Sequence, residues 1–203
     1  MEGLYFDSEN HQYYFEGEKK PCVSDILKMV DVIAMEGIPL RNIEKAAERG
    51  TLVHEATENL EYGLIDTLDD EWIQNNYEIM PYVLAYQNFL NDYPSKPIAR
   101  EESIFSKEKG FAGTIDIVKY INDEIAIVDI KTSKTISELR SILQLNAYRI
   151  AWNENHPDMP VTKLYILQLS DVGEYRFIPI DTNEERFNTY LNLFNEIKGD
   201  KKL

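Results

Sequence analysis

The stretch GFAGTIDIVKYINDEIAIVDIKTSK, residues Gly110–Lys134, decides the fold of this chain. It contains two short runs rich in isoleucine and valine. Between them lie Asn122 and Asp123, residue types that tolerate a positive φ. This pattern predicts a β-hairpin with a two-residue turn, in which Ile121 pairs with Glu124. The chemistry expected of the chain follows from that register.

The predicted register places Asp116 directly opposite Asp129, and Thr114 opposite Lys131. Facing side chains on one side of a hairpin lie ~4.5–5.5 Å apart at Cβ. Two carboxylates at that distance repel each other unless a cation lies between them, and a divalent metal such as Mg²⁺ prefers oxygen ligands of this kind. Lys131 follows Asp129 by two residues, so alternation puts both side chains on one face. The alternative is a surface cluster of charges on a solvated sheet face.

Side-chain alternation also predicts how the hairpin packs. The face opposite the charges is expected to lie in the core and to carry Ile115, Ile117, Val128 and Ile130. Val118 and Ile127 share the charged face further along the hairpin. That face is therefore expected to be covered at one end and to open into a cleft at the other.

Before the hairpin, turn residues and the helical spacing of apolar residues predict short strands followed by helices. The expected elements are antiparallel strands before Pro21, a helix capped by Ser24, a helix over about Leu40–Glu61 and a helix over about Asp70–Tyr93.

From residue 96 onward, the pattern predicts a mixed α/β fold. The expected elements are strands Ile98–Phe105, Gly113–Ile121 and Glu124–Lys131, a helix Ile136–Asn155, strands Leu164–Leu169 and Tyr175–Ile180, and a last helix capped by Asp181. This order predicts a mixed central β-sheet flanked by helices. We expect residues 1–203 to form a single domain, with 1–95 as an N-terminal hairpin and helical part and 96–203 as the α/β core.

The composition is that of a globular protein, with 43% hydrophobic and 28% charged residues. A net charge of −15 argues against tight, non-specific binding of nucleic acid through a basic surface, but it is compatible with an enzyme that holds divalent metal. The sequence shows no membrane span and no secretory signal. Cys22 is the only cysteine, so we expect a buried thiol and a cytoplasmic protein.

Several separated motifs resemble those of PD-(D/E)xK nucleases, in the branch that contains the nuclease domain of RecB. The core motifs are Gly113–Asp116, Val128–Thr132 and Gln144–Tyr148. Phe6–Gly17 and Ser24–Leu27 are similar to the start of small stand-alone members from phages and prophages. The resemblance implies a restriction-endonuclease-like core and DNA phosphodiester hydrolysis. It also implies an exonuclease that acts in recombination, repair or phage DNA processing.

The resemblance further implies a set of site residues. His54 would ligate metal together with Asp116 and Asp129, and the carbonyl of Ile130 would be an extra ligand. Imidazole favours softer ions than Mg²⁺, so Mn²⁺ is expected to be a good activator beside Mg²⁺. Lys131 would position the attacking water or stabilise charge on the phosphate, and the second role is favoured because two carboxylates lie close to it.

Three further side chains belong to the catalytic set that the resemblance implies. An acidic residue is expected on the strand before the hairpin; Glu101 and Glu102 point to opposite faces, and the spacing favours Glu101. Gln144 and Tyr148 are neighbours on one helical face and would lie beside the site. Many relatives carry an iron–sulfur cluster on four cysteines, which Cys22 alone cannot provide.

Some alternatives stay open from the sequence. Arg41, Lys45 and Arg49 lie at helical spacing and form either a solvated stripe or a strip that tracks phosphates. An endonuclease, an RNA-directed nuclease, or a non-catalytic nuclease-like module that binds nucleic acid or inhibits remain rival functions. DNA, single- or double-stranded, is the expected partner, and the sequence specifies no oligomeric state.

Overall fold

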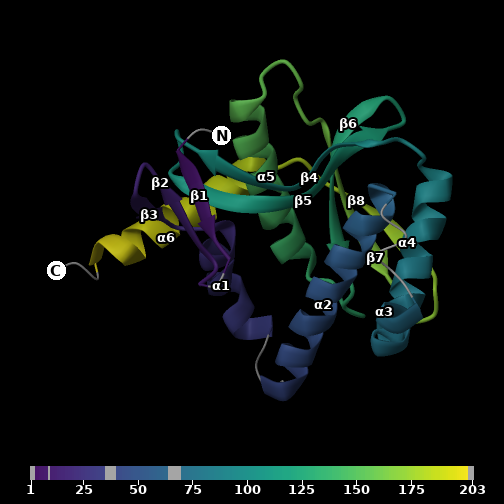
Figure 1. Cartoon of the computed structure of the whole chain (residues 1–203). Helices are drawn as coiled ribbons and strands as arrows, with labels where there is room; N and C mark the ends of the chain where they lie inside the picture. Colours follow the sequence, from purple (N-terminus) through teal and green to yellow (C-terminus); the bar gives the residue numbers. More distant parts are fainter. Residues whose placement is uncertain (1–2, 9, 35–39, 64–69, 201–203) are drawn as a thin grey trace.

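The computed structural model describes residues 3–8, 10–34, 40–63 and 70–200, and Figure 1 shows their arrangement. The helices are α1 (Val23–Ala34), α2 (Leu40–Glu61), α3 (Asp70–Asn75), α4 (Met80–Asp92), α5 (Glu138–Asn155) and α6 (Glu184–Asp200). The strands are β1 (Leu4–Asp7), β2 (Gln12–Phe15), β3 (Glu18–Lys20), β4 (Pro97–Ser106), β5 (Phe111–Ile121), β6 (Glu124–Lys131), β7 (Lys163–Leu169) and β8 (Tyr175–Ile180).

The central sheet has the strand order β4-β5-β6-β7-β8. All neighbours pair antiparallel except β6 and β7, which are parallel. Parallel neighbours need a crossover, and α5 supplies it between these two strands. The mixed sheet flanked by helices, expected from the sequence, is therefore confirmed.

The hairpin of β5 and β6 has the predicted register over part of its length. Asn122 and Asp123 have φ of 48° and 65°, as a two-residue turn with both φ positive requires. Pairing continues from Ile121–Glu124 to Ile117–Val128 and ends there. The expected cross-strand pair of Asp116 with Asp129 is therefore not part of the ladder, because β5 and β6 diverge one residue earlier.

Helices cover both faces of the central sheet, which gives three layers (Figure 1). The core on the side of α1, α5 and α6 includes Ile26, Ile115, Val118, Ile127, Trp152 and Phe187. The core on the side of α2 and α4 includes Val53, Tyr86, Phe89, Ile117, Val128 and Ile130. These two cores hold β5 and β6 on both faces and fix the position of the charged residues between them.

Side-chain alternation along β5 is broken at Asp116. Ile115 packs in the core with α5, whereas Ile117 packs in the core with α2, so the prediction that both share one face is wrong. The pairs on either side place Glu101 of β4 across from Asp116. Glu101 has φ of 44°, a left-handed value that a glutamate in a strand rarely adopts. Both β4 and β5 therefore depart from regular strand geometry where Glu101 and Asp116 lie across from each other.

The predicted helix over residues 70–93 is interrupted. The chain forms α3, then a 3-10 turn over Tyr77–Ile79, then α4. Pro81 lies in the first turn of α4, where its missing N–H costs nothing, but a helix running through it would lose a backbone hydrogen bond. Asn76, at the break, has non-helical dihedrals and donates its side-chain amide to the carbonyl of Trp72.

The last helix also begins later than predicted. Asn183, rather than Asp181, caps α6, since its side chain accepts the N–H of Arg186. Asp181 instead offers its carbonyl to the side chain of Asn146, which also accepts the N–H of Asn183. The buried Asn146 thereby fixes the turn that leads into α6.

The N-terminal strands form a separate antiparallel sheet, β1-β2-β3, that packs beside β4 and β5 (Figure 1). Its small core contains Tyr13, Phe15, Cys22, Phe105 and Ala112. Cys22 is buried, as expected, and forms an isolated bridge with Ala112 of β5. This contact joins the N-terminal sheet to the central one.

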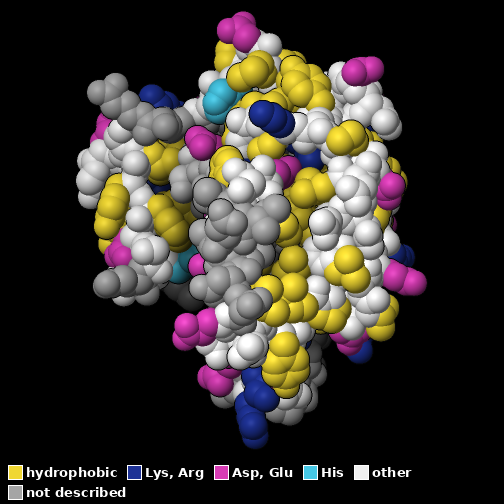
Figure 2. All heavy atoms as spheres, turned by 45° about the vertical axis from the view of Figure 1, so that its right-hand side comes forward, with side chains coloured by type: hydrophobic (Ala, Val, Ile, Leu, Met, Phe, Trp, Pro, Cys, Tyr) yellow, Lys and Arg dark blue, Asp and Glu magenta, His cyan; other side chains and the backbone are white. Residues whose placement is uncertain are grey.

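Hydrophobic side chains gather on the side of the molecule that Figure 2 turns forward. There, the 3-10 turn, α4 and the turn between β7 and β8 leave Tyr77, Leu84 and Val172 exposed. Within the described part of the chain, no helix has the length and apolar character needed to cross a membrane.

Candidate active site and metal centre

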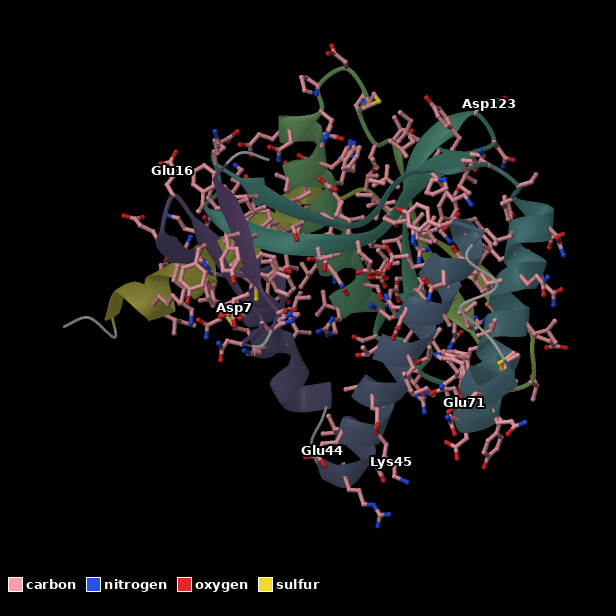
Figure 3. All side chains as sticks on the ribbon, in the orientation of Figure 1. Asp7, Glu16, Glu44, Lys45, Glu71 and Asp123 are labelled. Carbon is pink, nitrogen blue, oxygen red and sulfur yellow. The ribbon has the colours of Figure 1, made fainter. Side chains whose placement is uncertain are left out.

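A cleft of about 510 Å³ lies between α2 and the N-terminal sheet, and residues of β4, β5 and α5 also line it. Figure 3 shows the hairpin of β1 and β2, with Asp7 near its tip, and α2, with Glu44 and Lys45 at its outer end. Both project on the same side of β4 and β5. The charged residues predicted from the hairpin meet at the base of this cleft.

His54, Glu101 and Asp116 converge there from three different elements. Nδ1 of His54 lies 3.1 Å from Oε1 of Glu101, and Nε2 lies 3.8 Å from Oδ2 of Asp116. One ligand atom of each residue lies within 4.8 Å of the other two. Ligand atoms on one divalent cation, each ~2.0–2.6 Å from it, are separated by such distances. The left-handed φ of Glu101 accompanies the placement of its carboxylate beside His54.

Asp129 lies next to this group but is deeper, with 1% of its surface exposed. Nζ of Lys131 approaches Oδ2 of Asp129 to 2.5 Å, yet the direction is not that of a hydrogen bond. Neither carboxylate oxygen of Asp129 has a hydrogen-bond partner among the described residues. The ammonium of Lys131 balances part of the charge of this buried carboxylate, whose oxygens can also coordinate a metal ion.

Gln144 and Tyr148 extend the polar cluster from α5. The side-chain oxygen of Gln144 accepts from Nζ of Lys131 at 3.4 Å and from Nη1 of Arg140 at 3.2 Å. Its amide nitrogen donates to the hydroxyl of Tyr148 at 3.1 Å. Gly113 makes room for this tyrosine, because a Cβ there would lie 2.7 Å from the ring. The predicted i, i+4 pair thus lies beside Lys131.

The carboxylates set the protonation of the site in the metal-free protein. Burial alone lowers the pKa of His54, but the charges of Asp116, Glu101 and Asp129 outweigh it and raise the pKa to about 9. Burial, with the nearby charge of Asp116, raises the pKa of Asp129 above its ordinary value despite Lys131. The metal-free site therefore favours the imidazolium, which compensates part of the negative charge.

The donor set fits a divalent metal ion. Three carboxylates and one imidazole offer the oxygen and nitrogen ligands that Mg²⁺, Mn²⁺ and related ions accept. Asp129 adds to this donor set, because its buried carboxylate lies against Lys131 and makes no hydrogen bond with the described residues. Ile130 lies at the same place, and its N–H donates to Oδ2 of Asp116 at 2.7 Å.

A buried ionic network ties α2 to the strands behind the site. Glu61 pairs with Nη1 of Arg100 at 3.0 Å and with Nζ of Lys119 at 3.1 Å. Tyr86 donates its hydroxyl to the same carboxylate. Nη2 of Arg100 reaches the hydroxyl of Thr57, one turn after His54 in α2. This network sets the position of His54 relative to Glu101, the residue next to Arg100.

The other candidates from the sequence lie apart from the acidic cluster. Glu102 lines a separate hollow with Ser103 and Asn155, which leaves Glu101 as the acid at the site. Arg49 is half-buried and donates to the carbonyl of Thr132 at 3.4 Å. Arg41 and Lys45 are exposed, and Lys45 lies at the outer end of α2 (Figure 3).

Two side chains of the N-terminal sheet line the cleft and were not predicted. Tyr13 shares a 2.7 Å hydrogen bond with the hydroxyl of Thr114, and His11 lies beside it at the turn between β1 and β2. The alternation of aromatic and polar residues around them predicts a strand and no more. Their place in the cleft depends on packing between segments 101 residues apart.

With this geometry described, comparison with known proteins identifies the family. The sequence model of the PD-(D/E)XK nuclease superfamily matches residues 34–200. This chain belongs to that superfamily. The members of this superfamily are nucleases that use divalent metal ions, in agreement with the donor set of the cleft.

Solved structures provide more distant comparisons for this nuclease. It is similar to a candidate exonuclease from Eubacterium rectale, with 15% identity and a TM-score of 0.47, over 72% of this chain and 63% of that chain. It is also similar to SSO0001, with 14% identity and a TM-score of 0.36, over 75% of this chain and 71% of that chain. The chain spans less than two thirds of the Eubacterium rectale protein. No curated protein matches the sequence.

Proposed function

We propose that this nuclease hydrolyses DNA phosphodiester bonds with Mg²⁺ or Mn²⁺ and works as an exonuclease in recombination, repair or phage DNA processing. The observation that carries the proposal is the group of His54, Glu101 and Asp116 beside a buried Asp129. Several carboxylates gathered around a buried Asp129, which makes no hydrogen bond with the described residues and has Lys131 as its ion-pair partner, are costly for the fold alone. A bound cation would offset this cost, because these carboxylates would coordinate it.

These four side chains would hold the metal ion. The carbonyl of Ile130 is a further candidate ligand, because the N–H and carbonyl of one strand residue point to the same side, and this N–H points at Asp116. When bound, the metal ion supplies Lewis acidity for the phosphate and for the attacking water. Asp116 would then serve both as a ligand and as the acceptor that aligns Ile130.

Lys131 would stabilise negative charge on the phosphate as it develops. Its ammonium lies between Asp129 and Gln144, which fix its direction, and it keeps partial access to solvent. Arg140 shares the oxygen of Gln144 with Lys131, so two cations lie on either side of one neutral acceptor. A bound phosphate would reduce the repulsion between Lys131 and Arg140. This supports a path for the phosphate backbone beside Gln144 of α5.

Cleavage assays test the proposal directly. Linear, circular, single- and double-stranded DNA, each labelled at one end, are incubated with Mn²⁺, Mg²⁺ or EDTA, and RNA is included as a comparison. Release of short products from ends, with circles left intact, supports an exonuclease, whereas nicked circles support an endonuclease on the same site. If only RNA is cleaved, the substrate is RNA and not DNA.

Variants connect the activity to the site. Asp129→Ala and Lys131→Ala should each abolish metal-dependent cleavage. Lys163→Ala is a matched control, because Lys163 is exposed and pairs with Glu124 away from the cleft. Full activity in purified Asp129→Ala protein would contradict the assignment.

A further inference from the structure

The cleft has a wall that the family match does not include. The match begins at residue 34, so the N-terminal sheet and nearly all of α1 lie outside it. Yet His11 and Tyr13 of this segment line the same cleft as His54 and Asp116. The N-terminal segment therefore shapes the surroundings of the metal ligands without supplying any of the expected ones.

This wall presents a cluster of aromatic rings. Phe6 and Tyr13 stack with their ring centroids 4.5 Å apart, and His11 stands edge-on to Phe6 at 5.2 Å. Tyr13 is buried and anchored to Thr114, whereas His11 is exposed and has φ of 51° at the hairpin turn. The backbone thus holds an exposed flat ring at the cleft, supported from behind by two buried or half-buried rings.

The opposite wall is the surface of α2, where the residues that line the cleft before His54 have small side chains. Ala47, Gly50 and Thr51 line the cleft within the two helical turns before His54. A Cβ added to Gly50 would meet nothing within 4 Å, so open space lies in front of it. The hydroxyl of Thr51 donates back to the carbonyl of Ala47 and is occupied within the helix. An aromatic ring on one side and a bare helix face on the other leave room for a flat group.

Away from the metal ligands, the charges of the cleft disfavour phosphate as that group. Its lining includes Glu55 and Glu58 in addition to the metal ligands, and among the described residues no lysine or arginine lines it. The cations Lys131 and Arg140 lie instead around Gln144 on α5. A nucleotide can satisfy both regions only with its phosphate toward the cations and metal and its uncharged base in the acidic, aromatic cleft.

We propose that the cleft between α2 and the N-terminal sheet binds the nucleobase next to the scissile phosphate, stacked on His11 and facing Gly50. Bases stack on aromatic side chains without regard to sequence, because every base has a π-face. A base held in this way cannot be paired in a duplex at the same time. The substrate class is therefore an unpaired nucleotide, at a single-stranded region or a frayed end. This inference rests on the proposed nuclease function.

The test compares normal oligonucleotides with ones that lack a base. Single-stranded DNA carries either ordinary terminal nucleotides or abasic residues at each end in turn, and KM, kcat and the apparent Mn²⁺ affinity are measured for each. We expect wild-type protein to show a KM about 5- to 100-fold higher when the contacted base is missing. Duplex DNA with blunt ends should be cleaved more slowly than the same strand alone.

Two variants remove the site by different means. His11→Asn deletes the ring and keeps a residue that tolerates the left-handed φ, and it should raise KM for normal DNA by the same factor as base removal. On abasic DNA it should cause no further loss. Gly50→Leu fills the cleft while improving helix propensity, and should weaken binding of normal DNA with an unchanged Mn²⁺ affinity.

Matched controls and contrary results complete the design. Tyr5→Ala removes an exposed ring from the other face of the same sheet, and Gly199→Leu adds a side chain in open space on α6, so both should leave KM unchanged. If wild-type protein cleaves DNA but His11→Asn and Gly50→Leu leave KM unchanged, or raise it equally for abasic DNA, the base-binding cleft is refuted while the nuclease function stands. If wild-type protein cleaves no nucleic acid, both proposals fail.

Discussion

The carboxylate of Asp116 accepts the backbone N–H of Ile130 across the open end of the hairpin, with Oδ2 and the nitrogen 2.7 Å apart. This bond takes over where ladder pairing between β5 and β6 ends, at Ile117 and Val128. The same Oδ2 lies 3.8 Å from Nε2 of His54. This oxygen thus joins β5 to β6 by a hydrogen bond and also lies beside His54 as a candidate metal ligand. Substitutions can separate the structural role from the role in metal binding.

Asp116→Asn should keep the fold and lose the chemistry. The amide oxygen can still accept the N–H of Ile130, so the free energy of unfolding should stay within about 1 kcal/mol of wild type. Cleavage should fall at least about 100-fold, because the variant lacks one charged ligand. Asp116→Ala should lose cleavage and also about 1–3 kcal/mol of stability, since it leaves a buried N–H unpaired. Chemical denaturation and a cleavage assay check both; equal stability of the two variants would contradict the structural role.

Gly113→Ala should destabilise the protein through its contact with Tyr148. The added methyl would lie 2.7 Å from the tyrosine ring and 3.3 Å from Val23, both in the packed core. Overpacking of this kind costs about 1–3 kcal/mol, measurable as a lower denaturation midpoint in urea. Gly199→Ala is the control, because a methyl there meets open space. Tyr148→Ala should recover part of the loss when combined with Gly113→Ala; no recovery would place the clash elsewhere.

Metal-free protein should lose stability as pH rises from about 6.5 to 9. Burial lowers the pKa of His54, yet Asp116 and the other carboxylates raise it overall to about 9, above its ordinary value of 6.5. The folded state therefore binds the proton more tightly than the unfolded state. That contribution, about 3 kcal/mol, is complete below pH 6.5 and is lost as pH rises through 9.

Thermal melts in EDTA across this range measure the effect. His54→Gln should flatten the profile between pH 6.5 and 9. Saturating Mn²⁺ should reverse the trend, because the metal binds the deprotonated imidazole and competes with the proton. A wild-type profile in EDTA as flat as that of His54→Gln would show that the carboxylates do not hold the proton.

Glu61→Gln should be among the most destabilising single changes in the chain. It removes the carboxylate that pairs with both Arg100 and Lys119, whose side chains are buried. Leaving buried charges without a partner costs about 3–5 kcal/mol. Lys119→Met added to this variant should restore part of the stability by removing one of the cations, which calorimetry can detect. A smaller loss for Glu61→Gln than for Glu55→Gln, at an exposed position of the same helix, would refute this account.

Local patterns predicted the secondary structure well where packing agrees with them. α2, β6 and β8 have the expected bounds, because helical spacing and strand alternation are uninterrupted there. Turn chemistry predicted the hairpin that carries Asp116 and Asp129, but the predicted register did not hold as far as these two residues. The placement of His54 beside it followed from family resemblance, since spacing along one chain cannot orient a helix against a sheet.

Long-range packing explains what the sequence could not predict. The contact between Tyr13 and Thr114 joins strands of two different sheets. The bend at Asp116 depends on both β4 and β6, so strict alternation misplaced Ile115. Glu61 and Lys119 read as ordinary charges in sequence, and only the fold shows that they are buried together.

The buried ion pairs of Glu61 affect the free energy of local unfolding of α2. The C-terminal half of α2 cannot separate from the sheet without leaving Arg100 and Lys119 unpaired in the interior. Local opening of this helix should therefore be nearly as costly as global unfolding, so its amides should exchange with solvent together with those of β4 and β5. The helix that carries His54 then belongs to the same cooperative unit as the strands that carry the carboxylates. The ligand geometry would survive until the whole core unfolds.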